Sequence, residues 1–178
     1  MAINQRMEQA LNDQIKWELY SSYLYLSMSS WYESEGLKGF AQWEYVQAQE
    51  ERDHAIKIYR YVISRGGRVV LQPIDAPQSE WASPLAAFRH SLEHEQNVTK
   101  MIYNLVDIAT EEKDHATSNM LQWFVDEQVE EEDDAGQIVD QLEKIEKTDN
   151  LSLLYTLDKE LGTRVYVPLQ PTTAPGQQ

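Results

Sequence analysis

Apolar residues recur at intervals of three and four along most of the chain, which is the period of an amphipathic α-helix. The pattern predicts four long helices and one short helix, over residues 3–33, 37–65, 83–111, 114–147 and 150–162. Ser83, Asp114 and Asn150 are each suited to cap the helix that follows them. No segment shows the alternation of a strand, so the sequence predicts an all-α protein.

The predicted connections between the helices differ greatly in length. Gly36 separates the first two helices, and only a few residues separate the third from the fourth, so each pair forms an antiparallel hairpin. The connection over residues 66–83 contains two prolines and no helical period. It can extend over roughly 55 Å, whereas each long helix is roughly 40 Å long. The sequence therefore predicts a four-helix bundle with one long crossover between the second and third helices.

Length and composition narrow the possibilities further. A chain of 178 residues suits one domain, which we assign to residues 1–162, and we expect the tail over 163–178 to be disordered. The chain has 30 acidic and 15 basic residues and a net charge of −15, which favours cations over nucleic acids or membranes as partners. It has neither a long apolar span nor a signal-peptide pattern, which favours a soluble, cytoplasmic protein.

The residues that should face the bundle axis turn polar halfway along every long helix. The polar axial positions are Gln14, Glu18 and Ser21 on the first helix, Gln47, Glu51 and His54 on the second, Glu95 and Thr99 on the third, and Gln128 and Glu131 on the fourth. Glu18 and Glu51 lie at equal distances from the first hairpin joint, and Glu95 and Gln128 are placed similarly around the second joint. We therefore expect one polar layer in the middle of the bundle.

Such a layer needs positive charge, because buried carboxylates each cost several kcal/mol unless they are neutralised. No lysine or arginine lies on the axial stripes, which are the rows of residues that should face the bundle axis. A pair of divalent cations would supply the missing positive charge. The chain contains no cysteine, so any metal must be held by aspartate, glutamate and histidine. Glu51 and His54 lie one turn apart on one face, and a mixed oxygen and nitrogen shell favours iron over calcium or magnesium.

Several of these residues also have ordinary structural interpretations. The acidic run over residues 130–134 would by itself be a solvated helix face, and only Glu131 in it is axial. Tyr25 and Trp123 could serve in packing alone. The three remaining histidines, His90, His94 and His115, fall off the axial stripes, and we expect them on the surface.

Four segments carry a resemblance to a known family. ELYSSYLYLSMS from Glu18, QAQEERDHA around Glu51, EHEQNVTKMIYNL around Glu95 and LQWFVDEQVEEED around Gln128 resemble bacterial and archaeal non-haem ferritins, over about residues 4–161. The resemblance implies a ferritin-like di-iron domain and an iron-storage subunit with ferroxidase activity. Such a subunit oxidises Fe²⁺ to Fe³⁺ with dioxygen or hydrogen peroxide and stores a ferric mineral in a homo-oligomeric shell, usually of 24 subunits.

The resemblance also implies roles for individual residues. Glu18, Glu51 and His54 would hold one iron, Glu51 would bridge to a second iron held by Glu95, and Gln128 would sit nearby through water or oxygen. The additional iron site of prokaryotic ferritins would be formed by Glu50, Glu127, Glu130 and Glu131. Tyr25 would lie beside the iron pair as a one-electron donor, together with Trp123.

Two departures from related families shape the prediction. Glu127 is followed three residues later by Glu130, whereas bacterioferritins and rubrerythrins carry a second Glu-x-x-His there. Arg52 stands where bacterioferritins present a haem-ligating methionine, so we expect no haem. A peroxide-reducing protein of rubrerythrin type and a non-catalytic shell subunit remain as alternatives to the ferroxidase.

Overall fold

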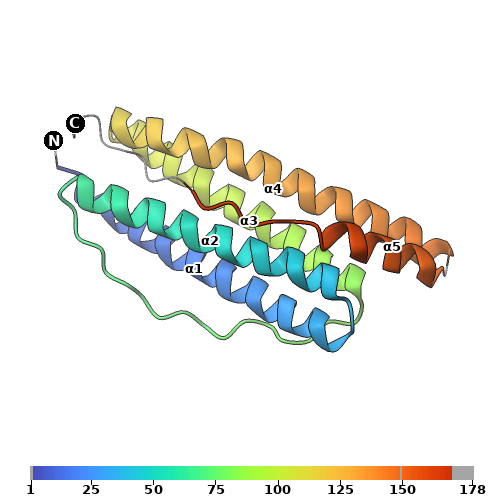
Figure 1. The fold of residues 1–178 in the computed structure, drawn as a ribbon. Helices are drawn as coiled ribbons and strands as arrows, with labels where there is room; N and C mark the ends of the chain where they lie inside the picture. The colour runs from blue at the N-terminus through green and yellow to red at the C-terminus, as the bar shows by residue number, and fades with distance from the viewer. Residues whose placement is uncertain (1, 149, 170–178) are drawn as a thin grey trace, which may run out of the picture.

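The helices in the computed structural model, which describes residues 2–148 and 150–169, agree closely with the predicted ones. They are α1 (Gln5–Ser34), α2 (Lys38–Ser64), α3 (Pro84–Glu111), α4 (His115–Thr148) and α5 (Leu151–Leu161). α1 to α4 form an elongated bundle, and α5 lies at one end of it, against α2 and α4 (Figure 1). The described residues contain no strand. The predicted all-α four-helix bundle with a short fifth helix is confirmed.

Side-chain caps begin three of the helices at the predicted residues. Ser83 accepts a hydrogen bond from the backbone N–H of Ala86 at 3.1 Å, at the start of α3. Asp114 accepts from the N–H of Thr117 at 3.1 Å, and Asn150 accepts from that of Ser152 at 3.0 Å. Each bond satisfies an N–H group that has no partner within its own helix.

The start of α2 is capped by a residue that is distant in sequence. Leu37 precedes the helix and provides no side-chain cap, and the carboxylate of Asp158 on α5 accepts from the N–H groups of Gly39 and Phe40 at 2.8 and 3.0 Å. Only glycine fits at position 39, because a Cβ atom there would lie 1.5 Å from the carbonyl oxygen of Asp158. These contacts fix α5 against α2.

The long crossover between α2 and α3 follows the outside of α1 (Figure 1). The side chain of Asn12 donates to the carbonyl of Arg68 at 3.0 Å and accepts from the N–H of Val70 at 2.7 Å. Further along, the Ser27 hydroxyl donates to the carbonyl of Gln78 at 2.7 Å. The crossover thereby carries the chain from one end of the bundle to the other, as its length predicts.

Two apolar clusters fill the two ends of the bundle. One includes Met28, Tyr32, Phe40, Phe88 and Leu142, together with the buried leucines of α5. The other includes the buried side chains Met7, Leu11, Ile58, Ile102 and Leu121. The predicted polar layer lies between the two clusters. The apolar side chains on either side of the layer therefore shield it from water. In the described part of the chain, no helix is both long and apolar enough to span a membrane.

Residues 163–169 belong to the tail that we expected to be disordered, and in the structure they lie along α2. Arg164 forms an ion pair with Glu50, and the Tyr166 hydroxyl donates to Asp53 at 2.6 Å. Carboxylates on α2 thus hold a segment whose proline content suggested disorder. The rest of the predicted tail, residues 170–178, lies outside the described residues.

Candidate metal centre

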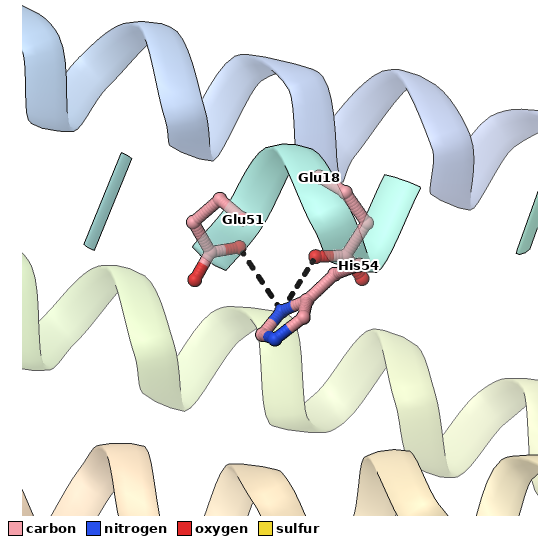
Figure 2. Close-up of side chains that lie close together, drawn as sticks. All are labelled: Glu18, Glu51 and His54. Atoms are coloured by element: carbon pink, nitrogen blue, oxygen red, sulfur yellow. Dashed lines mark ion pairs between the residues drawn. The ribbon is translucent and has the colours of Figure 1, made fainter. Parts of the chain in front are cut away.

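The first hairpin brings two carboxylates and an imidazole together in the polar layer. Glu18 comes from α1, and Glu51 and His54 come from successive turns of α2 (Figure 2). The Nδ1 atom of His54 lies 3.8 Å from Oε2 of Glu18 and 3.6 Å from Oε2 of Glu51. All three side chains are at most 2% exposed. Three ligand atoms therefore face one another in a dry interior.

The second hairpin adds Glu95 from α3 and Gln128 and Glu131 from α4, and all three are buried. The Tyr25 hydroxyl donates a short hydrogen bond to Oε1 of Glu95, and Nε2 of Gln128 donates to Oε2 of Glu95 at 3.1 Å. Gln128 also donates to Thr99 at 3.3 Å. The amide of Gln128 thus points its hydrogens at Glu95 and positions that carboxylate.

Two glutamines support the carboxylates from the side. Gln14 donates to Oε1 of Glu18 at 2.8 Å, and Gln47 donates to Oε1 of Glu51 at 3.1 Å and to Oε1 of Glu131 at 3.0 Å. In each of these three glutamates the second oxygen, Oε2, is buried and has no hydrogen-bond partner. Buried acceptors are normally satisfied, so these atoms are suited to a cation.

The ligand atoms form three overlapping groups that could each hold a metal ion. They are Glu18 with Glu51 and His54, Glu51 with Glu95 and Glu131, and His54 with Glu127 and Glu131. Within each group the ligand atoms lie within 4.8 Å of one another. Glu51 belongs to the first two groups, so it is placed to serve two neighbouring ions. The donor set of oxygens and one imidazole fits a transition metal such as iron.

The electrostatics of the layer agree with this interpretation. Burial raises the pKa of Glu51, Glu95 and Glu131, and the neighbouring carboxylates raise the pKa of Glu51 and Glu131 further. Burial lowers the pKa of His54, but Glu131 and the other carboxylates around it raise that pKa on balance. These pKa shifts favour the binding of protons in the layer, which reduces its negative charge. Metal ions that enter must displace those protons.

Comparison with known proteins identifies the family. The Ferritin-like domain family matches residues 8–145, which is most of the chain. The chain belongs to the ferritin family. Among its relatives, the bacterial non-heme ferritin of Bacteroides fragilis is 45% identical over 162 residues, which cover 91% of this chain and 99% of that protein. The bacterial non-heme ferritin of Staphylococcus aureus is 40% identical over 164 residues, 92% of this chain and 98% of that one. The predicted resemblance is confirmed.

Solved ferritin structures match the fold as well as the sequence. A ferritin of Archaeoglobus fulgidus engineered into a closed form is 54% identical, with a TM-score of 0.91, over 93% of this chain and 100% of that one. The open-pore ferritin of the same archaeon is also 54% identical, with a TM-score of 0.90, over 92% of this chain and 100% of that one. The ferritin-like fold class is thereby confirmed.

The residues predicted for the additional iron site of a ferritin are only partly gathered. Glu127 lies 3.8 Å from Nε2 of His54, and Glu131 is shared between two of the metal-holding groups. Oε2 of Glu50 lies 2.5 Å from Nη2 of Arg164, so Glu50 is engaged in an ion pair. Glu130 is exposed and belongs to none of the three groups. Trp123 packs edge-on against His54, with ring centroids 5.3 Å apart.

The prediction of surface histidines is wrong for His94. This residue is 8% exposed, and its Nε2 lies 2.7 Å from the hydroxyl of Ser21. Burial and the charge of His90 lower the pKa of His94 to about 4, so it is neutral at pH 7. His90 is half-buried beside Trp81, and only His115 is exposed. Position 94 directly precedes the axial residue Glu95. This side of α3 packs against α1, and the periodicity of a single helix cannot predict such packing.

Glu44 is the buried acid that the sequence reasoning missed. It is fully buried on α2, it accepts a hydrogen bond from Ser91 at 3.3 Å, and its Oε2 has no partner. Burial raises its pKa to about 8. The periodicity of α2 assigned its neighbour Trp43 to the bundle axis, so Glu44 was not counted among the axial residues. Its position two turns before Glu51 on the same helix face is the signal that could have indicated it.

Proposed function

We propose that this chain is an iron-storage subunit that oxidises Fe²⁺ to Fe³⁺ at a di-iron site inside each subunit. Membership of the ferritin family supports iron storage as the general function. The observation that carries the finer proposal is the set of buried, unpartnered oxygens on Glu18, Glu51 and Glu131 around the imidazole of His54. Buried oxygens that have no hydrogen-bond donor gain most from a bound cation.

In the proposed site, the two irons share one bridging ligand. Glu18 and His54 bind the first iron, Glu95 binds the second, and Glu51 contacts both, with Gln128 close by. Two ferrous ions lose one electron each, and dioxygen accepts both electrons and two protons to become hydrogen peroxide. Carboxylate ligands favour this step because they stabilise the ferric ion over the ferrous ion. Hydrogen peroxide is the alternative oxidant.

The surrounding residues have supporting roles in this proposal. Glu127 and Glu131, with Glu50 and Glu130, form an additional iron site on the side of His54 that faces away from Glu18. Tyr25, bound to Glu95, supplies a single electron when only part of the oxidant has been reduced, and Trp123 lies beside the same site. No haem takes part.

We further propose that the chain assembles into a cytoplasmic shell of 24 copies that encloses the ferric mineral. The apolar side chains Leu151, Leu153 and Tyr155 of α5 support this assembly, because they are 65%, 43% and 55% exposed on a single chain. A helix of this length also needs such partners to be stable.

The decisive experiment mixes the metal-free protein with Fe²⁺ and air and follows ferric absorbance by stopped flow. Glu51→Ala and His54→Ala should abolish the rapid phase, and the exposed matched residues Glu93→Ala and His115→Ala should preserve it. Unchanged kinetics in both site variants would remove the site assignment. The soluble iron load then tests storage. Iron that saturates at two or three per subunit would contradict storage, and repeated turnover with an added reductase would favour a peroxide-reducing enzyme.

A further inference from the structure

The last described segment, residues 163–169, forms a strap that returns along α2 after α5 ends. Figure 1 shows it running back beside α2, toward the middle of the bundle. Gln42 donates to the carbonyl of Arg164 at 3.3 Å, and Asp53 accepts from the Tyr166 hydroxyl at 2.6 Å and from the N–H of Leu169 at 3.2 Å. The strap belongs to no helix, so these polar contacts with α2 hold it in place.

Arg164 is the most tightly held residue of the strap. Its Nη2 atom lies 2.5 Å from Oε2 of Glu50, and its guanidinium lies 4.3 Å from the ring centroid of Trp43. The side chains of Arg164 and Glu50 are 22% and 26% exposed. Partial burial strengthens the pair relative to a surface ion pair, while the remaining exposure leaves room for an incoming ion to reach it.

The ion pair lies at the edge of the proposed additional iron site. Glu50 directly precedes Glu51 in the chain, and its carboxyl is close enough to Glu127 and Asp134 on α4 to interact with their charges. Burial raises the pKa of Glu127, and the positive charges of His54, Lys57 and Arg164 act in the opposite direction, with Arg164 the smallest of the three. Arg164 therefore supplies to Glu50 the positive charge that a metal ion would supply there, and it adds to the positive charge around Glu127.

We infer that Arg164 is a displaceable counter-cation of the additional iron site, so that a metal ion must displace its guanidinium from Glu50 and loosen the strap in order to bind there. This inference rests on the proposed function. A guanidinium and a divalent ion at the same carboxylate repel each other at short range, so the two cannot both occupy Glu50 favourably. The strap thus weakens the additional site selectively, and it leaves the ligands of the iron pair unchanged.

Zn²⁺ calorimetry on the metal-free assembled protein tests the inference. Zn²⁺ has no redox chemistry and accepts carboxylate and imidazole ligands, so binding is measured without oxidation. Arg164→Gln should tighten the weaker class of sites about tenfold and leave the tighter class unchanged. Arg164→Lys should restore most of the parent affinity because it keeps the charge. Arg89→Gln is the matched control, since Arg89 also pairs with a glutamate, Glu143 at 2.8 Å, on another part of the surface.

Hydrogen exchange of the strap gives an independent measurement. Saturating Zn²⁺ should speed amide exchange in residues 163–169 of the parent protein. The effect should include the N–H of Leu169, which donates a hydrogen bond to Asp53. Tyr166→Phe removes another anchor without a change of charge, and it should give a smaller tightening of the weaker sites.

Each outcome has one interpretation. The inference would be overturned if the weaker sites of the parent and of Arg164→Gln bound Zn²⁺ with equal affinity. It would also be overturned if Zn²⁺ filled those sites without faster amide exchange in the strap. A change in the tighter sites of the same size would also overturn it, because the effect would not be selective. Absence of any tight Zn²⁺ binding in the parent would instead remove the proposed di-iron site, and the inference with it.

Discussion

The two helical hairpins of the bundle contribute different chemistry to the same polar layer. Glu95, Gln128 and Glu131 each follow their counterparts Glu18, Glu51 and His54 by 77 positions. The hairpins therefore present equivalent backbone positions, with Glu-x-x-His on α2 and Gln-x-x-Glu on α4. The first hairpin by itself gathers two carboxylates and the imidazole, whereas Gln128 in the second hairpin uses its amide to hold Glu95.

This difference shows how a nearly symmetric bundle produces an asymmetric site. His54 is the only nitrogen ligand in the three metal-holding groups of the described residues, and it belongs to two of them. Its counterpart Glu131 also belongs to two groups, so these residues link the first hairpin to the second. We expect loss of the first hairpin's ligands to be more damaging than loss of their counterparts.

The largest predicted effect follows from comparing His54→Ala with Gln128→Ala. His54→Ala removes a metal ligand and should slow the rapid oxidation of Fe²⁺ by about 10³-fold. Gln128→Ala removes a group that positions Glu95, and it should slow oxidation by only about 10- to 100-fold. Stopped-flow absorbance measures both, and circular dichroism checks that both variants remain helical. Equal losses would show that the hairpins contribute equally.

A second prediction concerns Glu44, whose counterpart in the second hairpin is the buried, apolar Leu121. The folded protein keeps Glu44 protonated up to a pKa of about 8, against 4.5 as the ordinary value. Protons are therefore bound more tightly in the folded state, and Glu44 lowers stability as the pH rises from about 4.5 to 8. Glu44→Gln removes this loss. Its gain over the parent should approach about 5 kcal/mol at pH 9 and shrink toward pH 5.

Denaturant unfolding of the metal-free protein at several pH values measures this gain. The buried carboxylates Glu51 and Glu131 are present in both proteins, so their contributions cancel in the difference, whereas the charge of Glu95 is part of what raises the pKa of Glu44. Glu93→Gln changes an exposed glutamate and provides the matched control. Parallel stability curves for the parent and Glu44→Gln would contradict the assignment.

Tyr25 marks a smaller difference between the hairpins, because its counterpart in the second hairpin is the buried Ile102, which has no hydroxyl. Tyr25→Phe keeps the ring and removes the hydrogen bond to Glu95. We expect altered transient spectra during oxidation and a slower return to the starting state, by about three- to tenfold, with the fold preserved. Transient spectra identical to the parent's would make Tyr25 a packing residue only.

The smallest predicted effect lies at the two hairpin joints. Gly36 in the first joint and Lys113 in the second are counterparts, and both have positive φ, at 76° and 54°. Only glycine adopts this conformation at little cost, so Lys113→Gly should stabilise the protein by about 1 kcal/mol. Gly36→Ala should destabilise it by a similar amount, for conformational reasons alone, because a Cβ there meets nothing within 4 Å. Thermal unfolding measures both, and effects of the opposite sign would contradict the argument.

The helices, most of their caps and the residues of the polar layer could all be predicted from the order of the amino acids. Helical periodicity assigns a face to each residue from its near neighbours alone, and equal distances from the hairpin joints align the polar positions of paired helices. Glu18, Glu51, His54, Glu95 and Gln128 could therefore be predicted to share one layer. Charge then indicated cations, because no basic residue lies on the axial stripes.

Contacts between residues that are distant in the sequence could be seen only in the folded chain. Asp158 caps α2, Arg164 pairs with Glu50, and His94 is buried against α1, and none of these follows from the period of one helix. The same holds for Glu44, whose burial depends on how α2 is rotated against α3. A helix period specifies one face of each helix, whereas the flanks of that face become buried or exposed only when neighbouring helices pack against them.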